Sequence, residues 1–393
     1  MTSWIDDDLN DRRRRGLFRS RRHLLSAQGP RVRWRGREFV NFSSNDYLAL
    51  AADPRLARAA ARAARRYGCG AGASPLVSGH LPPLRALERA LARWEGTEAA
   101  LVFASGFAAN LAVVSSLAGR NDAVFSDELN HASLIDGCRL ARARVHVYRH
   151  ADAGHLADLL RREGPRARRR LIVSDSVFSM DGDFAPLPAL YDLARRHAAL
   201  LLLDEAHATG VLGQRGRGAT ELFPPPPDLS PERIVKVGTL SKALGAQGGF
   251  VCGPRQLVTW LVNVARPYVF STALAPPAAA AARAAVAIVE AEPERRRHLL
   301  ALSALMRRRL GMSGPACPVL PVVVGDARAA VRLSARLEEH GLLVPAIRPP
   351  SVPDGTARLR VSLTAGHTED DVTRLVEALA GCGVPIADCT FRG

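Results

Sequence analysis

Residues 235–250 read VKVGTLSKALGAQGGF, an apolar strand pattern that leads directly into a run of small residues. The stretch contains Lys236 and Lys242, which are the only lysines among the chain's 54 lysines and arginines. A lysine amine, unlike a guanidinium, can lose its proton, attack a carbonyl carbon and form a Schiff base. Lys242 follows the strand pattern and precedes small residues that allow close backbone approach to a ligand. The position favours a chemical role for Lys242, whereas Lys236 lies inside the strand and is interpreted as structural.

Strand and helix patterns alternate on either side of this stretch, from about residue 54 to 275. Apolar runs of strand length lie at residues 99–105, 122–127, 144–150, 171–177, 199–206, 233–240 and 249–253. Such strands, separated by helices, indicate a parallel or mostly parallel sheet covered on both faces. Ligands of these sheets gather at the carboxyl ends of the strands. Polar residues end or follow several of the runs: Ser105, Asp127, Ser174, Asp204 and Thr239.

The rest of the 393-residue chain predicts an N-terminal arm and a smaller C-terminal domain. We expect the arm at residues 1–50, with a basic helix at 12–27. A large α/β domain is expected at 51–284 and a small α+β domain at 285–393. A continuous helix at 276–310 is expected to lead from the first domain into the second.

The net charge of +16 raises the possibility of a nucleic-acid partner. The arginines are spread along helical patterns, however, and no RNA-binding, helix-turn-helix or zinc-finger motif accompanies them. We therefore expect no nucleic-acid partner, although basic patches could attract an anionic substrate such as a coenzyme A ester. The first residues show no apolar signal segment, and no apolar run is long enough to span a membrane. These patterns predict a cytoplasmic protein without a membrane partner.

The six cysteines are scattered and form no CxxC pair: Cys69, Cys138, Cys252, Cys317, Cys382 and Cys389. This spacing argues against a structural zinc site, so we expect reduced thiols and no metal.

Pyridoxal phosphate is the cofactor that best explains an isolated lysine in this setting, and the chain offers its other requirements. Asp204, at a strand end, can face the pyridine nitrogen and keep it protonated. His207, three residues later, can bond the phenolic oxygen. Ser105, Gly106 and Phe107 begin a helical pattern whose N–H groups suit a phosphate, and His131 can stack on the ring. Singly, Asp204 can also be explained as a turn residue and His131 as a helix cap.

A second interpretation of this region fails. LLLLDEAH at residues 200–207 has the form of a helicase Walker B motif. That motif works with an upstream G-x-x-x-x-G-K-[ST] loop, and both lysines lie downstream of it. Zinc-protease, serine-hydrolase and dinucleotide motifs are also missing from the sequence.

Several segments together resemble the α-oxoamine synthases of pyridoxal phosphate fold type I. The resemblance runs from about residue 9 to 380 and is carried by NFSSNDYLAL, SGFAANLAV, DELNHASLIDG, SDSVFSMDGDFAPL, LLLDEAHATGVLGQRGRG, TLSKALGAQGG, YVFSTALAPP and AIRPPSVPDGTARLRVSLTAGHT. One departure is Pro75, where the family often has Arg or Gly. The resemblance implies a large domain with a mostly parallel, helix-covered sheet and a smaller α+β C-terminal domain.

The resemblance also implies roles for individual residues. Lys242 would hold the cofactor and act as acid and base at the amino-acid Cα, with Asp204 on the pyridinium and His131 stacked on the ring as further catalytic residues. His207 and Ser179 would bond the phenolic oxygen. The phosphate would be bound by Gly106, Phe107 and Thr239, and by Thr272 across a homodimer interface with shared active sites. Arg360 would hold the substrate carboxylate, and Arg19, Asn45 and Ser351 would line the substrate pocket.

The segment IRPPSVPDGTARLR points to the family members that condense L-alanine with a pimeloyl thioester, on coenzyme A or acyl carrier protein, in biotin biosynthesis. The reaction would be a decarboxylating acyl transfer. A sister synthase that uses glycine or serine with another acyl-CoA remains the alternative. Strand alternation places Arg358 and Arg360 on the same face, so the pattern alone does not choose between them, and only the resemblance selects Arg360.

Overall fold

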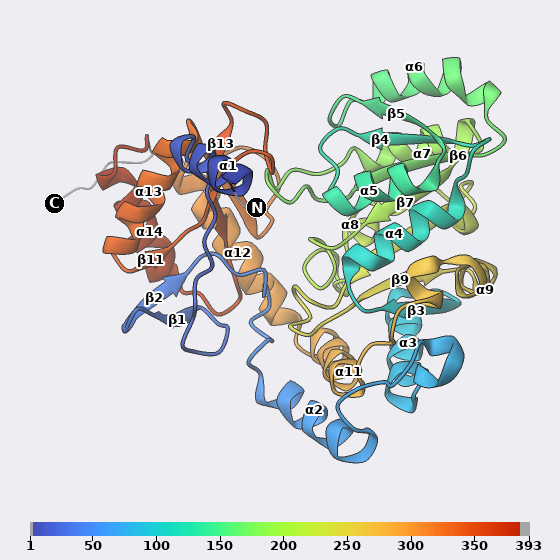
Figure 1. Ribbon diagram of the computed structural model, residues 1–393, viewed down its shortest axis with the longest axis horizontal. Coiled ribbons are helices and arrows are strands. Elements are labelled where there is room, and N and C mark those ends of the chain that lie inside the picture. The colour runs from blue at the N-terminus through green and yellow to red at the C-terminus, as the bar shows by residue number, and fades with distance from the viewer. Residues whose placement is uncertain (1–2, 386–393) are drawn as a thin grey trace. The chain divides into compact units, whose positions relative to one another are not determined.

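The computed structural model describes residues 3–385 (Figure 1). They group into two compact units. The large unit consists of Leu50–Phe178 and Asp183–Arg296. The small unit consists of the described residues of Met1–Ala49 and Arg297–Gly393 together with Ser179–Gly182. The residues expected as a separate arm thus group with the C-terminal residues, and the two units divide at residue 296 where the sequence suggested 284.

A seven-stranded sheet forms the centre of the large unit (Figure 1). Its spatial order is β3 (Ala99–Phe103), β9 (Gly249–Gly253), β8 (Ile234–Thr239), β7 (Leu200–Asp204), β6 (Arg170–Asp175), β4 (Ala123–Asp127) and β5 (Arg144–Tyr148). All strand pairs are parallel except the two made by β9. Each apolar run overlaps one of these strands, so the predicted mostly parallel sheet is confirmed.

Helices cover this sheet, as its apolar strands require (Figure 1). The central strands are buried along most of their length, and Leu201, Leu202 and Leu203 of β7 are fully buried. Helices α4 (Gly106–Leu117) and α5 (Ala132–Ala141) pack against each other, and α4 also packs on β8 and β9. The other helices are α2 (Pro54–Tyr67), α3 (Pro82–Glu95), α6 (Ala153–Glu163), α7 (Leu187–Arg196), α8 (Ala219–Leu222), α9 (Arg255–Val264), α10 (Arg266–Val269) and α11 (Pro276–Ala291), with short turns η1 (Pro75–Gly79), η2 (Gly164–Arg166) and η3 (Pro231–Arg233).

The small unit has an α+β arrangement built on two three-stranded sheets. One joins β1 (Arg31–Trp34), β2 (Arg37–Asn41) and β11 (Leu342–Leu343), and the other joins β10 (Val319–Gly325), β13 (Ala357–Ser362) and β12 (Ala346–Ile347). Helix α13 (Ala327–Glu339) packs on strands of the second sheet. Helix α14 (Glu369–Gly381) begins with a capping box between Thr368 and Asp371, as its acidic first turn favours.

Two helix predictions were wrong, each for a local reason. The expected basic helix at 12–27 is absent, because helix α1 (Ser3–Arg14) ends before Gly16, which has a φ of 68°. This left-handed conformation terminates helices and is open to glycine at little cost. The expected single helix at 276–310 is two helices, α11 and α12 (Pro293–Arg309). Pro293 lacks the N–H that would continue α11, so the second helix starts there.

The described cysteines are all unpaired: Cys138, Cys252 and Cys317 are buried, Cys69 is exposed and Cys382 is intermediate. Cys389 lies outside the described residues. Between residues 3 and 385, no helix is both long and apolar enough to cross a membrane.

Candidate active site

Four parallel strands of the large unit end in a polar residue. Strands β4, β6, β7 and β8 end at Asp127, Asp175, Asp204 and Thr239. Asp175 and Asp204 stand opposite each other in the register of β6 and β7. Because parallel strands end at the same edge of a sheet, these groups gather at one edge, where open α/β sheets bind ligands.

Lys242 lies next to this edge, in the loop between β8 and β9. Its Nζ is 2.8 Å from Nε2 of His207, in the segment that follows β7. The loop closes through a hydrogen bond from Leu240 N to Gly248 O. Gly245 has a φ of 57°, and a side chain there would start 2.4 Å from the backbone nitrogen of Ala51. The small residues after Lys242 are thus needed for a tight turn against neighbouring backbone.

Asp204 is buried, and each of its carboxylate oxygens accepts a hydrogen bond. Oδ1 accepts from the N–H of Ala206 at 2.8 Å, and Oδ2 accepts from Nδ2 of Asn110 at 2.6 Å. Asn110 comes from α4, and sequence reasoning missed it. The only signal for it was a polar side chain in the middle of the apolar segment SGFAANLAVV.

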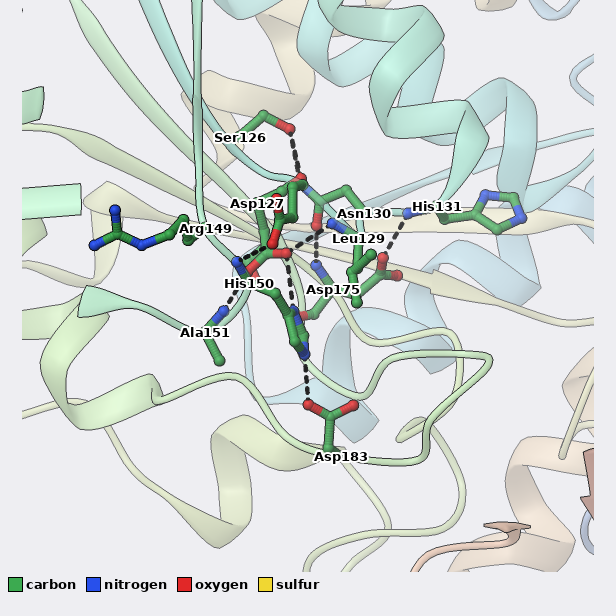
Figure 2. A network of polar contacts seen from close by, with 12 residues as sticks. Ser126, Asp127, Leu129, Asn130, His131, Arg149, His150, Ala151, Asp175 and Asp183 are labelled. Atoms are coloured by element: carbon green, nitrogen blue, oxygen red, sulfur yellow. Dashed lines mark hydrogen bonds and ion pairs between the residues drawn. The ribbon is translucent and has the colours of Figure 1, made fainter. Parts of the chain in front are cut away.

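His131 caps the N-terminus of α5 and is held by two neighbouring polar groups. Its Nδ1 accepts from the backbone N–H of Ser133, so the helix-cap explanation is correct, and the same nitrogen is 2.7 Å from Ser133 Oγ. Its backbone N–H donates to Asp175 Oδ2 at 2.7 Å (Figure 2). Burial lowers the pKa of His131; nearby Asp204 opposes this shift and Lys242 adds to it. Phe107 lies edge-on to the imidazole, with ring centroids 6.4 Å apart.

Asp175 is a buried carboxyl that the sequence did not single out. Burial raises its pKa well above the usual range, and the adjacent Asp204 raises it further. Its backbone N–H donates to Oδ1 of Asn130 (Figure 2). The Asn130 amide donates to Ser126 Oγ and to the carbonyl of Val173. The network anchors the backbone N–H of His131 and the side chain of the preceding residue, Asn130.

His150 extends this network between two carboxylates (Figure 2). Its Nδ1 is 3.0 Å from Asp127 Oδ1, and its Nε2 is 2.7 Å from Asp183 Oδ2. Burial lowers the pKa of His150, but the hydrogen bonds to the two carboxylates outweigh it and raise the pKa to about 10. A protonated His150 therefore stabilises this strand edge at neutral pH.

The N-terminus of α4 offers a place for a phosphate. Ser105 caps the helix by accepting from Ala108 N, and the first N–H groups of a helix have no intrahelical partner. A side chain on Gly106 would meet Thr239 at 3.3 Å, so Thr239 lies directly beside the start of the helix. Thr239 Oγ1 is also 2.8 Å from the hydroxyl of Ser241, which adds a polar group that the sequence analysis missed.

The large unit therefore contains the donor set that pyridoxal phosphate requires. It has an amine for the aldehyde carbon, a carboxylate for the ring nitrogen, two imidazoles and a helix N-terminus for the phosphate. A side chain at Gly106 would be crowded by Thr239, so the glycine keeps the start of the helix open to a phosphate. Residues 3–385 contain no group of three or more His, Cys, Asp or Glu side chains placed to hold a metal ion.

Two arginines of β13 in the small unit differ in their partners. Both are buried, but Arg358 forms an ion pair with Asp181. The described partners of Arg360 are all neutral: the Ser179 carbonyl at 2.5 Å, Asn45 Oδ1 at 3.0 Å, Ser362 Oγ at 2.8 Å and the Tyr47 hydroxyl at 3.3 Å. A buried guanidinium without a carboxylate favours binding of an external one. The structure thus supplies the distinction that strand alternation did not.

The remaining predicted site residues fall into three places. In the small unit, Nη2 of Arg19 is 3.5 Å from Ser351 Oγ, so these two are brought together. Ser179 contributes its carbonyl to Arg360, and its expected bond to a phenolic oxygen stays a prediction. In the large unit, Thr272 is exposed in the loop between α10 and α11, and its expected role across a dimer interface also stays a prediction.

Comparisons of this chain with a family model and with named relatives agree with one another. The family model for aminotransferase class I and II matches residues 37–379. A protein of Anaeromyxobacter sp. strain Fw109-5 named 8-amino-7-oxononanoate synthase is 56% identical, covering 96% of this chain and 94% of the relative. One of the same name from Anaeromyxobacter dehalogenans strain 2CP-1 is 53% identical with the same coverage.

Solved structures agree in fold. A Sphingomonas wittichii serine palmitoyltransferase has a TM-score of 0.91 at 31% identity, covering 98% of this chain and all of the other. A structure described as SPT with a PLP internal aldimine has a TM-score of 0.89 at 28% identity, covering 98% of each chain.

Proposed function

The chain belongs to the aminotransferase class I and II family, and within it to the 8-amino-7-oxononanoate synthases, and we propose that it joins L-alanine to a pimeloyl thioester with loss of carbon dioxide. It is a pyridoxal phosphate-dependent acyltransferase of fold type I. The observation that carries the proposal is the arrangement of Lys242, His207 and Asp204 at one sheet edge beside the N-terminus of α4. Pyridoxal phosphate, when bound, supplies an electron sink for the pair of electrons left when alanine loses its Cα proton.

Each proposed role in the large unit follows from a group's chemistry. Lys242 would hold the cofactor covalently, and its amine, when free, would remove the Cα proton of alanine and later return one. Asp204 would keep the pyridine nitrogen protonated. His207, whose Nε2 lies 2.8 Å from the Lys242 amine, would bond the phenolic oxygen. Gly106, Phe107 and Thr239 would bind the phosphate, and His131 would cover one face of the ring.

Arg360 binds the alanine carboxylate in this proposal. A planar guanidinium holds a carboxylate through two parallel hydrogen bonds. Asn45 and the Tyr47 hydroxyl fix its orientation, and burial raises the pKa of Tyr47 to about 12, so the phenol stays neutral. Arg19 and Ser351 contact the acyl substrate.

We further propose that two copies of the chain associate. In the large unit, Ala273 N donates to Ala73 O, which holds the loop before α11 against the segment that leads to η1. The same region exposes Val77 at 79% and Phe270 at 71%, which is unusual for large apolar side chains and favours a protein partner. Light scattering should give twice the mass of one chain. The cytoplasmic location and the choice between coenzyme A and acyl carrier protein stay predictions.

The reaction is tested by the absorbance of the bound cofactor. L-Alanine should shift this absorbance at concentrations at which glycine and L-serine do not. The pocket should fit the alanine methyl group, so glycine, which lacks that group, should bind more weakly through lost apolar contact. With a pimeloyl thioester present, carbon dioxide from the alanine carboxylate, the free thiol from the thioester and a product that joins the pimeloyl chain to the remaining alanine carbons should appear in equal amounts. A stronger response to serine, the substrate in the name of the structural relatives, would replace alanine in the proposal.

The carboxylate role is tested by Arg360→Lys. We expect alanine affinity to fall by about 1.5–3 kcal/mol, the range for a charged hydrogen bond, or roughly one to two decades. Cofactor binding and thioester affinity should change little, because Lys242 and other residues provide them. The measurement is a titration of L-alanine against the cofactor absorbance.

Arg358→Lys is the matched control, because the two arginines lie two residues apart on one strand and both are buried. Its cation already has Asp181 as a partner, so alanine affinity should stay at the parent value. A loss confined to Arg358→Lys would move the role by two residues. Parent affinity in both variants would remove the carboxylate role from this strand.

A further inference from the structure

We propose that Asn110 and Ser133 form a polar relay that connects Asp204 to His131 and sets which ring nitrogen of His131 carries the proton. The inference rests on the proposed function to the extent that Asp204 and His131 act on the cofactor ring. It adds two positioning residues that neither the motifs nor the sheet edge predicted.

Asn110 connects two parts of the large unit through one amide group. The residue is buried on α4, one turn after Gly106, and its Nδ2 carries two protons. Nδ2 lies 2.6 Å from Asp204 Oδ2 and 2.8 Å from Ser133 Oγ. Both amide protons are therefore used, one on each side of the relay.

The orientation of this amide follows from its neighbours. Exchange of oxygen and nitrogen would place Asn110 Oδ1 against the Asp204 carboxylate, which is repulsive. In the observed orientation, Oδ1 is buried and has no hydrogen-bond partner among the described residues. A buried acceptor without a partner destabilises a folded protein. The side chain is thus suited to donating two hydrogen bonds rather than to stability.

The relay then determines the state of His131. Because Ser133 Oγ accepts from Asn110, its own hydroxyl proton is available for His131 Nδ1 at 2.7 Å. The Ser133 backbone N–H also points to Nδ1, at 3.3 Å. A nitrogen that faces two donors must be the acceptor, so the neutral imidazole carries its proton on Nε2. Burial lowers the pKa of His131, which agrees with a neutral ring at pH 7.

The consequence for the site is a shared alignment of two groups. Asn110 of α4 contacts Asp204 directly and reaches His131 through Ser133. The helix whose N-terminus would bind the phosphate thus also aligns the carboxylate that would face the ring nitrogen and the imidazole that would cover the ring. Displacement of Asn110 would disturb both groups together. If Asn110 or Ser133 only stabilised the fold, its replacement would not be expected to change Asp204 and His131 together.

The test is the protonation of His131 in histidine-¹⁵N-labelled protein, measured by NMR before and after loading with pyridoxal phosphate. The His131 signal is the one that His131→Gln removes. The parent should show a protonated Nε2 and an unprotonated Nδ1. Ser133→Ala and Asn110→Ala should each move the two nitrogen shifts towards those of a mixture of tautomers, and the cofactor-loaded variants should lose about 10–100-fold in rate, as when an outer group orients a functional side chain.

A double-variant comparison separates the relay from two independent structural effects. In a relay, Asn110→Ala combined with Ser133→Ala loses no more rate than the more damaged single variant. Ser115→Ala is the control: its hydroxyl donates to Leu111 O on the same helix, and neither rate nor His131 shifts should change. Additive losses, or a parent protein with the proton on Nδ1, would overturn the relay. The NMR result does not depend on which substrates react, so failure of the alanine test leaves it intact.

Discussion

Lys242→Arg should abolish turnover, with a loss of roughly 10⁴-fold or more, as for removal of a covalent catalytic group. Arginine keeps the positive charge next to His207, but its guanidinium loses no proton at accessible pH and cannot attack the cofactor aldehyde. The variant should fold with parental stability, because Lys242 lies in a loop at the sheet edge. Pyridoxal phosphate should bind through its phosphate and ring contacts and be removable by dialysis, whereas the parent should retain it after borohydride reduction.

Lys236→Arg tests whether the effect is specific to position 242. Lys236 forms a buried ion pair with Glu95 and donates to the Arg217 carbonyl at 2.8 Å. A larger guanidinium in this enclosed space should lower stability by about 1–3 kcal/mol, the usual cost of overpacking. Turnover per bound cofactor should stay at the parent level. Parental activity in Lys242→Arg would exclude Lys242 as the covalent residue, and retention of reducible cofactor in that variant would point to Lys236.

The position of the candidate site was predictable because it depends on simple patterns. Buried parallel strands are continuous apolar runs, and the residue that ends each run must lie at the sheet edge. Asp127, Asp204 and Thr239 could therefore be found from spacing alone. Lys242 was found because arginine replaces lysine almost everywhere else in the chain. The helix at Gly106–Leu117 was marked by Ser105, a favoured N-cap residue.

Side-chain partners distant in sequence were not predictable. Arg358 and Arg360 are equivalent in strand alternation, and only the folded chain brings Asp181, 177 residues away, to one of them. Asn110 likewise looked like a polar interruption in a helix, because its partners Ser133 and Asp204 are 23 and 94 residues away. The pattern places a residue on an element, but its hydrogen bonds depend on how elements pack.

The wrong helix at residues 12–27 has a different cause. Arginine and leucine are good helix formers, so the local sequence favours a helix across Gly16. The chain instead ends α1 at Arg14 and forms β1 only at Arg31. Helix propensity was overridden by a glycine that takes a left-handed conformation.

Asp204→Asn should slow removal of the alanine Cα proton by on the order of 10²–10⁴-fold, the contribution of a positioned proton-holding group. An amide bears no charge and cannot keep the pyridine nitrogen protonated, so the cofactor is a weaker electron sink. The change also places an amide against Asn110. In the parent protein, Nδ2 of Asn110 donates to Asp204 Oδ2 at 2.6 Å. Cofactor should still bind, because Lys242 and the phosphate contacts remain. The measurement is deuterium exchange at alanine Cα without thioester, so acyl transfer does not contribute.

Asp127→Asn provides the comparison, since Asp127 ends β4 as Asp204 ends β7 and both are buried. Asp127 accepts from Leu129, Ala151 and His150, so its loss should lower stability without changing exchange per bound cofactor. Equal slowing in both variants would mean that exchange responds to damage at the sheet edge. Parental exchange in Asp204→Asn would refute its role. Slow exchange confined to Asp204→Asn, with parental cofactor binding, requires a carboxylate at that one strand end, because the two substitutions remove the same charge from the ends of two strands in one sheet.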